Sequence, residues 1–344
     1  MSGTELPRRF HTTAGPLPEP GQLDPNTAHP FETVEPAASG YAHNGATRLW
    51  YAVWGEQGPW LAFPPHFQIV HSALLKAAVP WLSQHFRVLT MDGRGNGRSD
   101  RPQGQEHYSF DLYYQDFVAV LDAAGVDRVA VIGISAGAMT ALRFAAEHPQ
   151  RTTHVITAGG FASSLIPSPK VEAMVEAENQ RMREDWPGYI DAFMANIFNE
   201  PHSTKPYEDG VHWAWASSGE VIDWCYRGWR NQDVREQARQ VRCPTLVIHG
   251  TNDQRVLYPR GCAIHELVPG AKMLTIGMHC RYPVNMNCRI WLIRLLRRFV
   301  NTPTVSATLF WYKTRHAYPK ACRKKKTLWK KVTGTGNWVT ASYK

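Results

Sequence analysis

Apolar residues between positions 40 and 160 recur at two different spacings, and the spacing changes several times along the chain. Short runs rich in β-branched and aromatic residues predict strands at 59–65, 87–92, 128–134 and 153–160. Between them the apolar positions follow helical spacing, over 72–86 with a break at Pro80, over 109–125 and over 136–148. Strands that alternate with helices predict an α/β fold with a mostly parallel central sheet and helices on both faces.

Further sheet elements are expected on both sides of this segment. Two strand-like runs flank Asn44-Gly45, a dipeptide typical of tight hairpin turns, so an antiparallel pair is expected at one sheet edge. Residues 161–240 keep helical spacing without a strand candidate, and we interpret them as a helical lid over the ligand-binding edge of the sheet. Strand-like runs return at 244–250 and 271–277, and a final helix is predicted over 283–300.

The chain is therefore expected to have three parts. Residues 1–38 form a leader with seven prolines in its first 36 positions, a composition typical of extended or poorly ordered chain. Residues 39–300 form the α/β domain with its lid, and residues 301–344 form a basic tail.

The positive charge of the protein is concentrated in that tail. Residues 301–344 hold ten Lys and Arg and no Asp or Glu, while the whole chain has a formal net charge of +9. The remaining 300 residues therefore carry a net charge of −1, and the basic character says little about the substrate of the α/β domain. The composition fits a solvated or disordered tail, and it also fits a tail that contacts acidic surfaces such as anionic lipid or nucleic acid.

Composition also bears on compartment and cofactors. No run of 18 apolar residues predicts a transmembrane span, and the first residues lack the apolar segment of a secretory signal. The six cysteines form no Cys-x-x-Cys pair that would indicate a zinc site or a disulfide framework. We therefore expect a cytoplasmic protein without a metal or other cofactor. The sequence contains no motif for specific nucleic-acid binding and no pattern that indicates an oligomeric state.

The predicted strand at 128–134 ends in the motif Gly133-Ile134-Ser135-Ala136-Gly137, directly before a predicted helix. A serine between two glycines at such a junction predicts a nucleophile elbow, a turn so sharp that side chains at 133 and 137 would clash. The turn would hold the Ser135 hydroxyl above the carboxyl end of the sheet. The N–H of Ala136 would lie at a helix N-terminus, which favours developing negative charge.

A serine hydroxyl becomes a strong nucleophile only when a base takes its proton and a carboxylate orients that base. In this architecture both partners should follow later strand ends, the acid first and the histidine second. Asp253 follows the strand at 244–250, and His279 follows the strand at 271–277. Asp223 and Asp233 lie upstream as alternative acids, and Asp253 has the alternative role of a helix cap.

Together these motifs resemble the α/β-hydrolase superfamily over about residues 40–300. The resemblance rests on RVLTMDGRGNGRSDRP, VIGISAGA, PTLVIHGTND and GMHC, at 87–102, 131–138, 244–253 and 277–280. The catalytic triad of the family then falls on Ser135, Asp253 and His279. The resemblance also implies structural roles, in the turn after the strand at 87–92, for Arg94, Arg98 and Asp100.

One stretch departs from the pattern of that family. Related hydrolases usually carry His-Gly after the strand that ends near residue 63, but this chain has Phe63-Pro64-Pro65-His66-Phe67. Proline has no N–H to donate, so the nearest second donors of an oxyanion hole are the N–H groups of His66 and Phe67, beside that of Ala136. The imidazole of His66 is also a candidate substrate contact.

Aromatic residues gather in the predicted lid. Five tryptophans lie within 44 residues, at 186, 213, 215, 224 and 229. Their rings fit either the lining of an apolar pocket or the packing of the lid on the sheet. Candidate substrate-binding residues are Ile134, Trp213 and Trp224, and we expect a small-molecule acyl substrate with an apolar portion.

The resemblance implies a serine hydrolase that cleaves an ester or related acyl bond through an acyl-enzyme, without a cofactor. Families with this framework also include C–C bond hydrolases, lactonases and cofactor-free perhydrolases. The departure at 63–67 keeps open a ligand-binding sensor with negligible turnover. The basic tail keeps open a third class, binding to membranes or nucleic acid.

Overall fold

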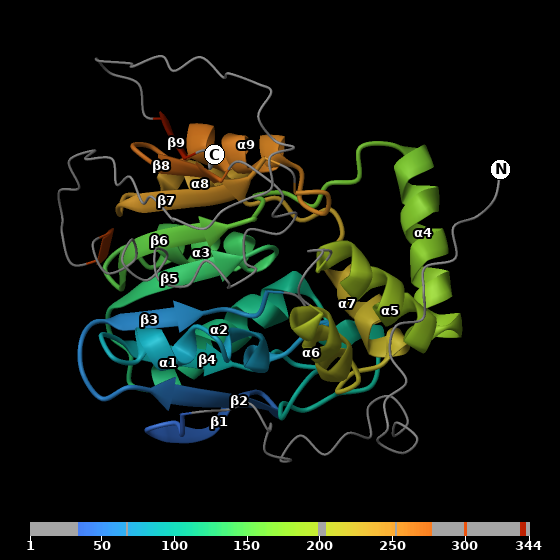
Figure 1. Ribbon diagram of the computed structural model, residues 1–344, viewed down its shortest axis with the longest axis horizontal. Coiled ribbons are helices and arrows are strands. Elements are labelled where there is room, and N and C mark those ends of the chain that lie inside the picture. The colour runs from blue at the N-terminus through green and yellow to red at the C-terminus, as the bar shows by residue number, and fades with distance from the viewer. Residues whose placement is uncertain are drawn as a thin grey trace, which may run out of the picture.

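The computed structural model describes residues 34–66, 68–198, 204–251, 253–276, 299–300 and 338–341. A nine-stranded sheet runs through these residues in the order β1-β2-β4-β3-β5-β6-β7-β8-β9 (Figure 1). The strands are β1 (Ala38–Asn44), β2 (Thr47–Trp54), β3 (Trp60–Phe63), β4 (Arg87–Met91), β5 (Val129–Ile134), β6 (Thr152–Ala158), β7 (Thr245–Gly250), β8 (Lys272–Ile276) and β9 (Trp338–Ala341). β2 pairs antiparallel with β1 and with β4, and all other neighbouring strands are parallel. The predicted fold class, with its antiparallel edge, is confirmed.

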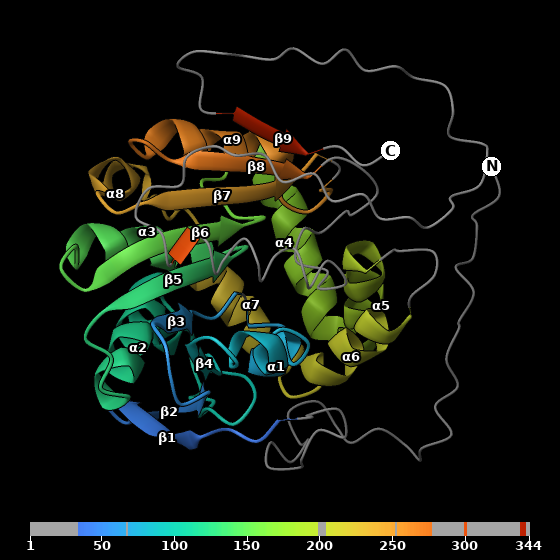
Figure 2. The ribbon, with the colours of Figure 1, turned by 60° about the vertical axis from the view of Figure 1, so that its left-hand side comes forward.

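Helices cover both faces of the sheet, and further helices cover its carboxyl edge (Figure 2). The helices of the two faces are α1 (Val79–Leu82), α2 (Phe110–Ala123), α3 (Gly137–Glu147), α8 (Arg235–Gln240) and α9 (Tyr258–Leu267). The lid helices are α4 (Pro169–Glu184), α5 (Trp186–Ile197), α6 (Lys205–Ala214) and α7 (Gly219–Gly228). None of the helices in the described segments combines the length and apolar character that a membrane span requires.

Three apolar clusters correspond to these layers. One packs α2, α3, α8 and α9 against the sheet around Phe117, Phe144 and Val131. A second lies on the other face, where α1 contributes Leu82 beside Phe86 of the following turn. A third joins the lid helices to Ile69, in the loop after β3. The lid is therefore packed on the sheet domain through its own apolar core.

Local sequence explains where several elements begin and end. The Ser109 hydroxyl accepts a hydrogen bond from the Leu112 N–H at 3.2 Å and so caps α2. The β1–β2 hairpin turns at Gly45, whose φ of 59° suits glycine. The segment predicted as a helix broken at Pro80 is instead a 3₁₀ turn at Ser72–Leu75 followed by α1. The break precedes α1 because Pro80 occupies its first turn, where a helix tolerates proline.

The predicted basic tail contains one strand, β9, that we did not predict. β9 pairs parallel with β8, with Leu274 opposite Val339 in the register. The rest of the tail, the leader before residue 34, the residues Phe67 and His279, and the predicted helix at 283–300 up to residue 298 lie outside the described residues.

The turn after β4 is held by two arginine–carboxylate pairs of different burial. Arg94 donates two hydrogen bonds of 2.6 Å to Asp116 on α2, and both side chains are almost fully buried. Arg48 pairs with Asp100 at 2.9 Å, but more than half of the Arg48 side chain is exposed. Arg98 places its guanidinium 4.5 Å from the centre of the Trp50 ring. These contacts fix the turn that lies under the lid.

Burial raises the pKa of Asp116, although Arg94 and Asn44 oppose this shift by hydrogen bonding to the carboxylate. We predict that Arg94→Met lowers the free energy of unfolding by about 3–5 kcal/mol, because it leaves a buried carboxylate without its cation. Urea denaturation at pH 8 measures this loss. Arg48→Met is the matched control and should change stability little, since its ion pair is solvent-exposed. Equal losses in the two variants would contradict this assignment.

Candidate active site

Ser135 lies at a strained turn between β5 and α3. Its φ of 50° is in the left-handed region, and Asn231 is the only other non-glycine residue there among the described residues. The Ser135 N–H donates to the Ala158 carbonyl at 3.0 Å, which ties the turn to the end of β6. A non-glycine residue held in this region is typical of functional turns whose surroundings enforce the strain.

The glycines around Ser135 permit a close approach of strand, helix and loop. A Cβ atom on Gly133 would lie 2.6 Å from the Ala138 Cα atom and from the Gly137 carbonyl oxygen. A Cβ atom on Gly160 would clash with the Ala138 side chain. A Cβ atom on Gly137 would come within 3.1 Å of the Pro65 carbonyl oxygen. The helix α3 can therefore start directly at the end of β5 only because these positions lack side chains.

Backbone hydrogen bonds connect the carboxyl ends of four parallel strands. β5 and β6 are joined through Ser135, and the Gly159 N–H donates to the Ile248 carbonyl of β7 at 2.9 Å. The Thr251 N–H then donates to the Ile276 carbonyl, the last residue of β8, at 3.0 Å. The loop that holds Asp253 thus begins two strands away from Ser135, a spacing of about 10 Å.

Asp253 is held by its own loop through one carboxylate oxygen. Its Oδ1 atom accepts hydrogen bonds from the N–H groups of Arg255 and Val256 at 2.9 and 2.8 Å. Its Oδ2 atom is buried and has no hydrogen-bond partner among the described residues. Burial raises the pKa of Asp253 to about 6, against the effect of the two backbone donors. The free oxygen can accept an imidazole N–H, as the acid of a serine triad does.

A histidine that the sequence did not single out lies beside this carboxylate. The Nε2 atom of His249, on β7, is 3.8 Å from Asp253 Oδ2, which is too far for a hydrogen bond. The same nitrogen is 2.7 Å from the Val256 carbonyl oxygen, to which it donates. Burial lowers the pKa of His249, so its ring is neutral. His249 therefore shapes the acid loop and leaves Asp253 Oδ2 without a hydrogen bond.

The loop after β3 runs against the first turn of α3. The Cα atom of His66 is 3.6 Å from the Cβ position of Gly137, so the loop that lacks donors at Pro64 and Pro65 lies beside the N-terminus of the elbow helix. The His66 side chain is buried, and this burial lowers its pKa to about 4. The N–H of Ala136 lies at the same helix terminus, where backbone N–H groups have no intrahelical acceptor.

The residues predicted to bind substrate make packing contacts. Ile134, the last residue of β5, is buried in the apolar cluster on the α1 face of the sheet. The Trp224 ring stacks on Tyr108 at 5.6 Å between centroids, and the Trp213 ring lies 6.2 Å from that of His71. Both tryptophans thus join lid to sheet domain, and a contact with substrate stays a prediction.

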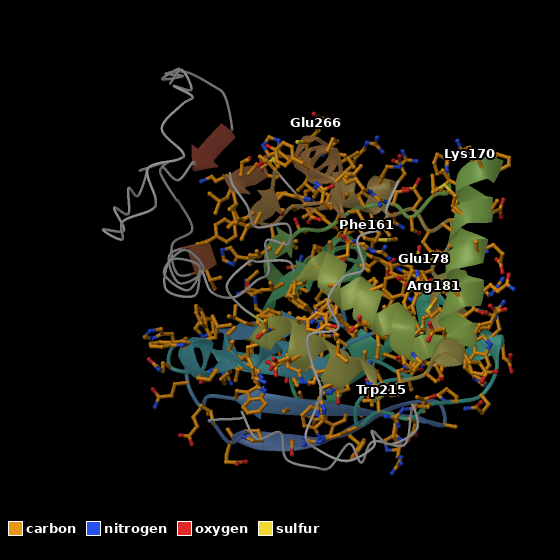
Figure 3. The ribbon with its side chains drawn as sticks, turned by 45° about the vertical axis from the view of Figure 1, so that its right-hand side comes forward. Phe161, Lys170, Glu178, Arg181, Trp215 and Glu266 are labelled. Carbon is orange, nitrogen blue, oxygen red and sulfur yellow. The ribbon has the colours of Figure 1, made fainter. Side chains whose placement is uncertain are left out.

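Arg255 connects the acid loop with three lid helices. Its guanidinium donates to the Tyr226 hydroxyl of α7 at 2.9 Å and lies 3.5 Å from the Glu178 carboxylate of α4. It also lies 4.8 Å from the centre of the Phe193 ring of α5. Figure 3 shows Glu178 between α4 and the body of the protein. The backbone N–H of Arg255 also donates a hydrogen bond to Asp253 Oδ1. Arg255 therefore links the lid directly to the candidate acid.

No group of three or more His, Cys, Asp or Glu side chains within the described ranges is arranged to hold a metal ion.

A mostly parallel sheet, with a strained serine turn at its carboxyl edge and a helical lid above, is the architecture of an α/β hydrolase. Residues 68–209 match the model of a protein family that is described as alpha/beta hydrolase fold. The chain has the α/β-hydrolase fold, as the sequence motifs predicted, and its similarity to hydrolases of that superfamily supports an enzyme of the same kind.

Its relatives differ in the bonds that they cleave. The chain is 25% identical over 235 residues to the 2-hydroxy-6-oxo-2,4-heptadienoate hydrolase of Pseudomonas putida, which covers 65% of this chain and 82% of the relative. The structure of an enol-lactonase from Burkholderia xenovorans has a TM-score of 0.67 at 22% identity and covers 76% of this chain and 100% of its own. The structure of an esterase from Rhodococcus sp. has a TM-score of 0.67 at 22% identity and covers 77% of this chain and 99% of its own.

The strain at Ser135 has a measurable cost. We predict that Ser135→Gly has a free energy of unfolding about 0.5–1 kcal/mol higher than Ser135→Ala, because glycine adopts a positive φ without steric penalty. Both variants lack the hydroxyl, so the difference between them measures the steric cost of the backbone conformation at position 135. Urea denaturation measures the difference. An alanine variant that is the more stable of the two would show that the turn is unstrained.

The raised pKa of Asp253 predicts a dependence of stability on pH. Between pH 4 and 6 the unfolded chain loses the Asp253 proton before the folded protein does, so wild-type stability falls across this window and stays lower above it. Asp253→Asn keeps the Oδ1 acceptor and removes the cost of a buried charge. We therefore expect the variant to exceed the wild type at pH 8, by at most about 3 kcal/mol and by less to the extent that His279 donates to Oδ2, and to equal it near pH 4.

The measurement is the free energy of unfolding in urea at several pH values. A variant that is less stable than the wild type at pH 8 would mean that the Asp253 carboxylate stabilises the fold, against this prediction.

Proposed function

We propose that the protein is a serine hydrolase that cleaves an ester or related acyl bond of a small, partly apolar substrate through an acyl-enzyme. The observation that carries the proposal is the strained Ser135 at the carboxyl edge of the sheet, two strands from a buried carboxylate with a free oxygen. A hydroxyl and a carboxylate at this separation need a bridging base. The sequence places His279 three residues after the end of β8, the next strand beyond the acid loop.

In the proposed mechanism, His279 takes the proton of the Ser135 hydroxyl while the oxygen attacks the acyl carbon. Asp253 accepts a hydrogen bond from the other ring nitrogen and stabilises the imidazolium. The N–H groups of Ala136 and of His66 or Phe67 receive the oxyanion. His279 then protonates the leaving alcohol, and water, activated by the same imidazole, releases the acid and regenerates Ser135.

A second candidate is the hydrolysis of a C–C bond on the same three residues. The similarity to the 2-hydroxy-6-oxo-2,4-heptadienoate hydrolase of Pseudomonas putida favours it. Ester cleavage remains the first proposal because the chain also resembles an esterase and an enol-lactonase in fold, and both of their names describe the cleavage of an acyl–oxygen bond.

The proposal is tested with a fluorophosphonate probe and a panel of p-nitrophenyl esters. We expect the wild type to be labelled and to turn over at least one short-chain ester. Ser135→Ala should lose labelling and about 10⁴-fold or more in kcat, and His279→Ala a similar factor. Asp253→Asn should lose about 10³–10⁴-fold, because the base loses its orientation.

The matched controls are Ser39→Ala and His43→Ala, both at exposed positions of β1, which should retain wild-type turnover. Hydrolysis that survives in Ser135→Ala would overturn the mechanism. Labelling without turnover of any ester would favour a C–C bond substrate, or a sensor that binds acyl ligands.

A further inference from the structure

Two buried polar side chains lie on the loop between the elbow helix and the lid. His66 is 6% exposed and Gln68 is 1% exposed. The His66 backbone lies against Gly137 at the start of α3, and the Asn96 side-chain amide donates a hydrogen bond to the Gln68 carbonyl. The next residue, Ile69, is buried in the apolar core of the lid. The loop that carries His66 and Gln68 therefore runs from the start of α3 to the apolar core of the lid.

The polar atoms of these side chains lack partners. His66 Nδ1, Gln68 Oε1 and Gln68 Nε2 are buried and form no hydrogen bond within the described part of the chain. Each unpaired buried polar atom costs stability, about 1–3 kcal/mol, and buried polar groups in folded proteins are usually paired. Three such atoms on one short loop beside the candidate nucleophile indicate a site that a polar ligand group completes.

The charge and hydrogen-bonding capacity of the pair define that group. Burial holds the pKa of His66 near 4, so the imidazole is neutral, and its hydrogen bond to the Pro64 backbone uses the other ring nitrogen as donor. The Nδ1 atom is then an acceptor. The Gln68 amide adds one donor group and one acceptor. A neutral pair of this kind matches a hydroxyl group, which both donates and accepts, and offers no charge to neutralise a carboxylate.

We propose that His66 Nδ1 and the Gln68 amide form a polar subsite that binds a hydroxyl group on the acyl part of the substrate, close to the acyl carbon. This inference rests on the proposed serine hydrolase function and narrows its substrate class to hydroxyacyl esters. The hydroxyl donates to His66 Nδ1 and accepts from the Gln68 amide. The position near the acyl carbon follows because the His66 N–H is also a candidate donor to the oxyanion.

The test compares kcat/KM for the phenyl esters of butyrate, 2-hydroxybutyrate and 3-hydroxybutyrate. The wild type is expected to prefer one hydroxy ester over the butyrate ester by about tenfold or more, which is the effect of one well-made hydrogen bond. In Gln68→Met, which replaces the amide by an apolar chain of similar size, this ratio should fall to near one. Met174→Ala, at an exposed position of α4, is the control and should keep the wild-type ratio.

Thermal unfolding supplies an independent readout. Because the Gln68 amide lacks partners, Gln68→Met should melt at or above the wild-type temperature. A lower melting temperature would mean that the amide is paired inside the protein, and the subsite would be wrong. A wild type that hydrolyses all three esters at similar rates, or a preference that survives in Gln68→Met, would also overturn the subsite. Inactivity toward every ester would instead count against the proposed function.

Discussion

The steric constraint at Ser135 determines how the rest of the candidate site is arranged. A serine with a φ of 50° persists only where the surroundings enforce it, and here β5, β6 and α3 meet around it with glycines at the points of contact. The same close approach brings the loop of His66 beside the N-terminus of α3. One turn thus places the hydroxyl, the helix N–H groups and the polar loop at the same edge of the sheet.

The lid is coupled to this edge through both packing and charge. Ile69 belongs to the apolar core of the lid, and its neighbours on the loop after β3 lie beside the elbow helix. Arg255 donates its backbone N–H to Asp253 and binds α4 and α7 with its guanidinium. A movement of the lid would therefore displace the candidate acid and the candidate oxyanion loop. Such coupling suits an enzyme that assembles its site around the substrate.

The fold could be predicted from the sequence because periodicity and glycine placement report directly on strands, helices and their junctions. The elbow at Ser135 was predictable for the same reason, since Gly133 and Gly137 are needed only if the turn is tight. Pair interactions were not predictable: the contact of Arg255 with Glu178 joins residues far apart in sequence, and no periodicity encodes it. The buried, unpaired polar atoms of Gln68 could not be predicted either, because the burial of a polar residue in a loop depends on the lid that packs above it. The strand β9 was not predicted because its four residues are too few to show a periodic pattern.

The most direct test of the proposed triad is a crystal structure of the protein after reaction with a phosphonate ester inhibitor. We predict a covalent bond between phosphorus and Ser135 Oγ, with the phosphoryl oxygen within hydrogen-bond distance of the Ala136 N–H. We also predict that the His279 imidazole lies between the adduct and Asp253 Oδ2. An adduct on a different residue, or a different histidine bonded to Asp253 Oδ2, would contradict it.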